Sequence, residues 1–353
     1  MPASASITGG IEEELARTRR KGLRIALAVS LGFTWAVASG AIIPFLGPLF
    51  AAQFLIGSAR PLPVGKAVGM LVLVLFVGSI LQWVTAATSE RPMVLLPLLG
   101  LFFFACFHAQ AAGRGGPATF LLLVVGIMVP LLTILHRDLG TSALALLAHG
   151  IGSGILLMWL AHAIIPDTGI SEAAPVASAV HPRPAARAAA DAIILLLIVT
   201  VCLAKDEWAT AMVIPITVAS IQTQLDVSAG ARASIGLVLV NLIGGIAASL
   251  AFVLLQVRPS LLSMFVLVLL AGLIFGGRAA LSSATARVYA GALTTFLLIF
   301  GAGVSPLPGT AAETFSTRIG YIVVAIAYAM LMGALLWPRP TPSWPPVQHP
   351  RVT

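Results

Sequence analysis

The chain has 353 residues, of which 59% are hydrophobic and only 9% are charged. Soluble domains carry roughly a quarter charged residues, so this composition excludes a water-soluble enzyme and indicates an integral membrane protein. The net charge of +8 does not indicate nucleic-acid binding, because the basic residues stand in short loops beside apolar stretches. There they orient a membrane protein and contact the lipid bilayer.

Crossing the hydrocarbon core takes about 20 helical residues, and the sequence predicts an all-α membrane protein with twelve transmembrane helices. A cytoplasmic N-terminal segment, 1–23, with a short helix over 11–21, precedes two six-helix units over 24–166 and 186–338. A cytoplasmic linker, 167–185, joins the units, and a disordered tail, 339–353, follows them. The predicted spans are 24–43, 45–58, 67–87, 93–112, 117–135, 141–165, 186–204, 208–222, 234–256, 259–276, 285–304 and 316–337.

The two units resemble each other. Gly69 and Gly78 recur 167 positions later as Gly236 and Gly245, and the units end alike in an apolar helix with Trp and Pro. Because each unit has an even number of spans, we expect parallel repeats related by an axis along the membrane normal. We expect Gly69 and Gly236 to lie where helices approach closely, since small residues permit such packing in membranes.

Loop charges predict the orientation. An N-terminus in the cytoplasm puts fifteen basic residues on that side and five on the other. Such a bias is typical of multi-pass proteins with the basic side inside the cell. We therefore expect both termini to be cytoplasmic.

The second span of each unit is short and contains proline, Pro48 in one and Pro215 in the other. Paired interrupted helices of this kind are typical of transporter binding sites, because broken helices expose backbone groups that can hold an ion. Gln53 and Gln222 lie in these spans, where an amide could bind a carboxylate or cap the broken backbone. The alternative is a tilted or half-crossing helix without a ligand.

Polar residues inside spans are candidates for function because they are costly in lipid. His149, near mid-depth, is the first candidate for proton coupling, although it could instead bond a neighbouring helix. Asp191 could carry protons or pair with a nearby arginine, and Asn241 could line the path or hold helices together. No Walker loop and no metal-ligand spacing appears, so we expect no enzyme activity, metal or other cofactor.

Three stretches carry a family resemblance: the basic-then-apolar start from Arg24 to Pro44, the basic residue and glycine that open the third spans, and the last span from Arg318 to Trp337-Pro338. With them the chain resembles the fusaric acid resistance and aromatic acid exporter family of bacterial inner-membrane proteins. It lacks the large cytoplasmic domain of the long members and looks like a short member.

The resemblance implies efflux of small, often aromatic, organic acids driven by the proton gradient across the bacterial inner membrane. A periplasmic adaptor protein and an outer-membrane channel are further candidate partners. A passive organic-anion channel of the same fold is the alternative function. We expect the path to run between the two short spans, with cationic side chains guiding the anion: Lys66, Arg232, Arg287 and Arg318.

Overall fold

The structure is a computed structural model that describes residues 3–58, 60–114, 117–135, 137–166, 183–204, 213–224, 230–281, 286–305 and 311–337. For some helical residues, 230–241 and 311–319 among them, it describes the backbone without the side chain. Most of the predicted linker and all of the predicted tail lie outside these residues.

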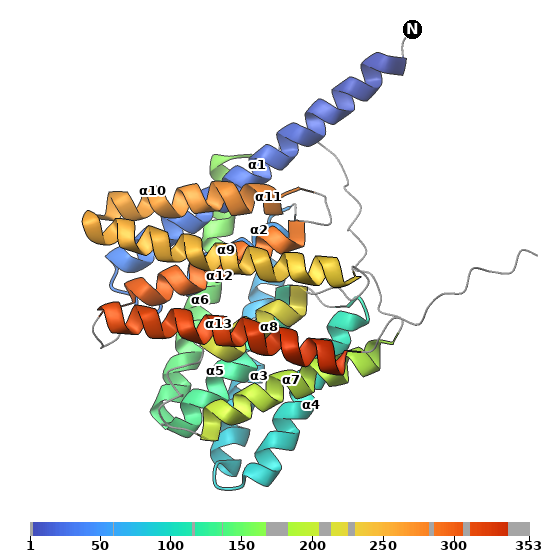
Figure 1. The fold of residues 1–353 in the computed structure, drawn as a ribbon, viewed down its shortest axis with the longest axis vertical. Coiled ribbons are helices and arrows are strands. Elements are labelled where there is room, and N and C mark those ends of the chain that lie inside the picture. The colour runs from blue at the N-terminus through green and yellow to red at the C-terminus, as the bar shows by residue number, and fades with distance from the viewer. Residues whose placement is uncertain are drawn as a thin grey trace, which may run out of the picture.

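Regular structure in the described residues is helical, and a helix lies within or across each of the twelve predicted stretches (Figure 1). The fourth helix of the second unit is divided by a π-helical turn, η3. The helices of the first unit are α1 (Ala3–Ala38), α2 (Leu46–Gly57), α3 (Val64–Thr88), α4 (Pro92–Ala111), α5 (Pro117–Leu135) and α6 (Arg137–Ile164). Those of the second are α7 (Pro184–Ala204), α8 (Val213–Gln224), α9 (Gly230–Val257), α10 (Leu261–Ala271), η3 (Gly272–Gly276), α11 (Gly277–Ala279), α12 (Ala286–Val304) and α13 (Ala311–Leu336).

Two details of the first helix differ from the prediction. The short helix expected over 11–21 is continuous with the first span, in the single helix α1. This helix ends at Ala38 rather than at residue 43, because Gly40 adopts a φ of 73°. The amide of Ala41 then donates to the carbonyl of Ala36 at 2.9 Å, the hydrogen bond that closes a helix at a left-handed glycine.

Seven helices among the described residues are long and apolar enough to cross a membrane by length and composition. On α3, large apolar side chains such as Val72, Phe76 and Trp83 are exposed, as a lipid-facing surface requires. The protein is therefore a multi-pass membrane protein that associates with the lipid bilayer.

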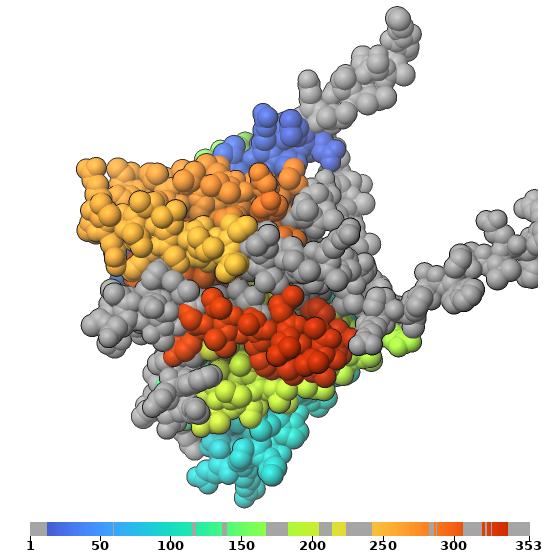
Figure 2. All heavy atoms as spheres, in the orientation of Figure 1, coloured from blue at the N-terminus to red at the C-terminus, as the bar shows by residue number. Residues whose placement is uncertain are grey.

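The two units contact each other in a reciprocal way. The fourth helix of the first unit, α4, packs along α7, while α10, η3 and α11 pack along α1. In Figure 1, α10 accordingly lies beside α1 at the top and α4 lies beside α7 at the bottom. The fifth and second helices also meet across the units, α5 against α8 and α12 against α2. Figure 2 shows α10, α9, α13, α7 and α4 following one another down one face.

Glycines let the backbones of α1 and of the α10–α11 segment approach each other closely. A Cβ on Gly22 would lie 2.8 Å from the Cα of Gly277, and one on Gly272 would lie 2.7 Å from the Cα of Ala26. The predicted tenth span ends at residue 276, but the helix continues through Ala279, where Gly276 packs against Ile25 and Gly277 against Gly22 of α1. The π-helical turn η3 lies at this crossing, as single π turns within α-helices often mark unusual packing.

Gly69 does not lie at a close approach, contrary to expectation, since a Cβ there would meet nothing within 4 Å. The tight position in α3 is Gly78, where a Cβ would lie 3.3 Å from Val125 on α5. Position 69 is exposed because α3 contacts α5 and α6 with its opposite face. Gly236 lies where only the backbone is described.

Candidate functional site

The two short helices lie in the interior of the protein. In α2, nine of the twelve residues are buried, and in α8 residues 214–222 are all buried. A helix of 12 residues is about 18 Å long, whereas the hydrocarbon core is about 30 Å thick. At least one end of each helix must therefore be satisfied inside the protein. Pro48 and Pro215 each occupy the third helical position, where a missing N–H leaves no helical hydrogen bond unmade.

At the end of α2, side chains from α1 supply hydrogen bonds to backbone carbonyls. Lys21 Nζ donates to the Ile56 carbonyl at 2.9 Å, in the last turn of α2. Arg24, which is buried, donates from Nε to the Ile165 carbonyl at 2.7 Å, directly after α6. Cations are favourable at helix C-termini, where the carbonyls lack helical partners and the dipole is negative. These two residues thus hold the ends of α2 and α6 against α1.

The second unit has a different arrangement at the corresponding place, which we call the Asp191 cluster: Arg187, Asp191, Gln222 and Trp337. Arg187 Nε donates to Asp191 Oδ2 at 2.6 Å, and both side chains are only 5% exposed. Trp337 Nε1 donates to Asp191 Oδ1 at 2.9 Å. Gln222 Nε2 donates to the Asp191 carbonyl at 3.0 Å and lies 3.4 Å from Oδ1. The cluster thereby joins α7, α8 and the end of α13.

Two features stabilise this buried charge pair. Hydrogen bonds to ionised groups are about twice as strong as neutral ones, and the carboxylate accepts them from three side chains. The guanidinium of Arg187 also lies 3.8 Å from the centre of the Trp337 ring, a cation–π contact that gains strength when shielded from water. Losing one partner of such a pair leaves an uncompensated buried charge and costs about 3–5 kcal/mol.

A side-chain amide hydrogen bond also connects each short helix to a helix of the other unit. Gln53 Nε2 of α2 donates to Thr294 Oγ1 of α12 at 3.0 Å and joins the two units. Gln110 Nε2 of α4 donates to the Thr223 carbonyl of α8 at 2.8 Å and does the same. The Oε1 atom of Gln222 is buried and has no hydrogen-bond partner among the described residues.

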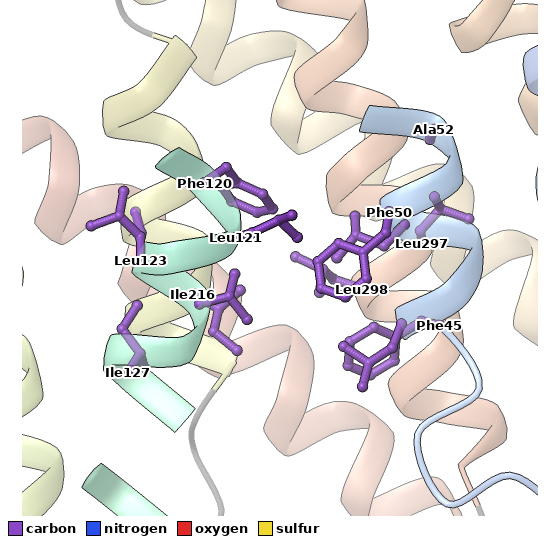
Figure 3. Close-up of a cluster of buried hydrophobic side chains, with 14 of the residues drawn as sticks. Phe45, Phe50, Ala52, Phe120, Leu121, Leu123, Ile127, Ile216, Leu297 and Leu298 are labelled. Carbon is purple, nitrogen blue, oxygen red and sulfur yellow. The ribbon is translucent and has the colours of Figure 1, made fainter. Parts of the chain in front are cut away.

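The space between α2 and α5 is filled with apolar side chains. Figure 3 shows Phe120 and Leu121 of α5 on one side, with Phe50 of α2 and Leu298 of α12 facing them. Phe50, Leu121 and Leu298 are at most 1% exposed. The seam where the sequence places a path is therefore packed closed at this level.

The predicted proton-coupling residues lie in different surroundings. Asp191 is buried in the cluster, whereas His149 is exposed on the outer face of α6, on the same side as Leu156 and Leu160. Lys66 is exposed near the start of α3. For the other predicted path residues the structure describes the helical backbone but not the side chain: Arg232, Asn241, Arg287 and Arg318.

The sequence predicted a nearby arginine as an alternative partner of Asp191. The structure identifies it as Arg187, whose spacing of four from Asp191 favours an ion pair on one helix face. Trp337 was predicted only as the end of the last span. Its contact with Asp191 depends on how α13 packs against α7, and local sequence does not encode that packing.

No group of three or more His, Cys, Asp or Glu side chains gathers in the part of the chain that the structure describes. Family models, curated protein sequences and solved structures give no match to this chain.

Proposed function

We propose that the protein exports small organic anions across the bacterial inner membrane, using the proton gradient. The observation that carries the proposal is the pair of 12-residue helices α2 and α8, both buried and both second in their unit. Short helices of this kind, whose ends are held by side chains within the protein, are where transporters bind their substrates. The resemblance to aromatic acid exporters suggests the substrate class.

A relation between the units as parallel repeats supports this proposal. Pro215 of α8 follows Pro48 of α2 by 167 positions, the same interval that separates Gly78 from Gly245. The packing of α4 on α7 and of α10 on α1 is reciprocal, as is that of α5 on α8 and α12 on α2. A twofold axis along the membrane normal would produce these pairs.

The orientation in this proposal has both termini in the cytoplasm, from the positive-inside bias of the loops. The seam between the units then holds the path. Because Leu298 of the second unit is buried beside Phe50 and Leu121 of the first, transport requires the units to rock against each other and part Leu298 from these two side chains. Such rocking about a fixed site is the usual form of alternating access.

Transport by the purified protein in lipid vesicles tests the proposal. Vesicles loaded with radiolabelled benzoate should lose it faster with the protein than without it, and an imposed pH gradient should drive benzoate against its own gradient. Loss of benzoate that only follows the benzoate gradient would identify a passive organic-anion channel. Vesicles that retain benzoate, and a panel of other organic acids, would refute the proposal.

Gln53→Leu sharpens this test, because it removes the amide that joins α2 to Thr294 at the seam. A matched control is Gln82→Leu. Gln82 Nε2 also donates to a threonine, Thr141 Oγ1 at 2.7 Å, but that contact is exposed between α3 and α6. The Gln53 variant should slow benzoate efflux severalfold at equal protein content, while the Gln82 variant should match the unsubstituted protein.

A further inference from the structure

Two copies of the protein pair in the membrane, we propose, through one face of α6. We call this surface the outer face of α6, and it consists of Ser142, Ala145, His149, Gly152 and Leu156. The inference does not rest on the proposed function, because it concerns a surface of the protein that lies away from the contact of α2 with α12.

The outer face of α6 is open to the surroundings of the protein. Ser142, Ala145 and His149 are exposed, and Leu156 is 62% exposed. At Gly152, which is half-buried, an added Cβ would meet nothing within 4 Å. Since this helix is long and apolar enough to cross a membrane, its outer face meets either lipid or another protein.

Lipid is a poor surrounding for His149. The apolar part of α6 is Gly140–Ile164, and His149 lies within one turn of its midpoint. At a rise of 1.5 Å per residue, this position is about 18 Å from the start of α6 and about 22 Å from its end. Long basic side chains near helix ends reach the polar interface, but an imidazole at this depth does not. Ionisable residues within spans almost always face protein or water and pair with one another.

One glycine of α6 has no close contact within the chain. Gly150 and Gly154 pack against α2, since a Cβ on Gly150 would lie 2.9 Å from the Cβ of Leu46 and one on Gly154 would lie 2.8 Å from the Cβ of Phe50. Gly152 lies between them on nearly the opposite side of the helix. Glycine weakens a helix, but small residues let a second membrane helix approach its backbone closely. Gly152 therefore suits a helix that the single chain does not supply.

The spacing of the outer face favours a second copy of the chain as the partner. Its five positions follow one another at intervals of three, four, three and four residues, the heptad spacing of helices that pair side by side at about 20°. Two copies in the same orientation, related by a twofold axis along the membrane normal, bring equal depths together. Each position then meets the same face of the other copy. Because an imidazole both donates and accepts a hydrogen bond, the two His149 rings complement each other.

Photobleaching of singly labelled full-length protein in vesicles of lipid alone tests the inference. The fraction of proteins that bleach in two steps, and are therefore paired, should rise with protein density. His149→Leu should raise the dissociation constant of the pair at least tenfold, because it removes the polar contact. Gly152→Leu should do the same, because it pushes the two helices apart. Both positions are open in the single chain, which therefore accommodates the new side chains.

Gly320→Leu is the matched control. Gly320 is an exposed glycine in α13, the sixth helix of the second unit, and a Cβ there would also meet nothing within 4 Å. This variant should pair as the unsubstituted protein does. A protein that stays single at every density would show that lipid or another protein covers the outer face, and would overturn the inference. Pairing that neither His149→Leu nor Gly152→Leu weakens would overturn it as well.

Cysteine cross-linking locates the contact. The two native cysteines, Cys106 and Cys202, are buried, so a cysteine introduced at the surface is the accessible thiol. Leu156→Cys should form a disulfide between two copies on mild oxidation in the membrane. Leu270→Cys is the control, because Leu270 is similarly exposed, at 54%, but lies on α10, and it should stay uncross-linked. Cross-linking of Leu270→Cys but not of Leu156→Cys would mean that the copies pair through another face, and would refute the assignment.

Discussion

The two units of the protein solve the same packing problem with different chemistry. In each, the first helix must hold the end of the second and the end of the sixth. The first unit does so with cations on neutral carbonyls, Lys21 on Ile56 and Arg24 on Ile165. The second does so with a carboxylate, Asp191, which is bonded to Gln222 and Trp337. Position 191 follows position 24 by the same 167 residues that separate α8 from α2.

This difference shows which of the two sets of contacts can change with pH. A carbonyl accepts hydrogen bonds at any pH, so the contacts of the first unit are fixed. A carboxylate accepts them as an anion and loses its charge when it is protonated, so the contacts of the second unit can change. The contacts of the second unit thus depend on the charge of one carboxylate, whereas those of the first unit do not.

The largest expected effect comes from removing a cation in each unit. Arg187→Met leaves a buried carboxylate unpaired and should lower the free energy of unfolding by about 3–5 kcal/mol. Lys21→Met leaves only a neutral carbonyl without its donor and should cost about 1–2 kcal/mol. Reversible unfolding in mixed detergent micelles measures both. Equal losses would show that the Arg187 and Lys21 contacts contribute equally to stability, and would contradict the difference between the units.

A smaller effect is expected from the two tryptophans near the ends of the sixth helices. Trp337→Phe removes a hydrogen bond to a charged acceptor and should cost about 1.5–3 kcal/mol. Trp159→Phe removes the bond from Nε1 to the Leu62 carbonyl, 2.9 Å long, and should cost about 0.5–1.5 kcal/mol, as neutral hydrogen bonds do. The same unfolding measurement applies. A larger loss for Trp159 would mean that the charge at Asp191 adds nothing to its indole contact.

The reciprocal contacts between the units should differ as well. Gly272→Ala puts a methyl group 2.7 Å from backbone of α1 and should cost about 1–3 kcal/mol, as overpacking does. In the reciprocal contact of α4 with α7, a Cβ on Gly100 would lie 3.1 Å from a methyl group of Leu196. That side chain can move, so Gly100→Ala should change the free energy of unfolding by less than about 1 kcal/mol. If both variants lose equal amounts of stability, the α1 crossing is not the tighter of the two.

The helices themselves followed from local sequence. The fourth span was predicted as 93–112 and forms Pro92–Ala111, because charged residues and proline precede a long apolar stretch and glycine follows it. The short helices were recognisable from their length and from Pro48 and Pro215. The continuation of the tenth span through Gly276-Gly277 could not be recognised from the sequence, because glycines indicate a turn unless another helix packs on them. Gly22 supplies that packing from more than 250 residues away.

By itself, the sequence determined that the chain lies in a membrane, where its helices run, and which polar residues must be accounted for in lipid. Those properties depend on hydrophobicity and on local backbone preference, and both are set by residues close together in the sequence. Only the tertiary structure decided that Asp191 lies buried between Arg187 and Trp337, while His149, the equally polar candidate, lies exposed on α6. The reason is that a helix brings residues to a contact only through the neighbour it packs against, and α13 packs against α7 across more than a hundred intervening residues.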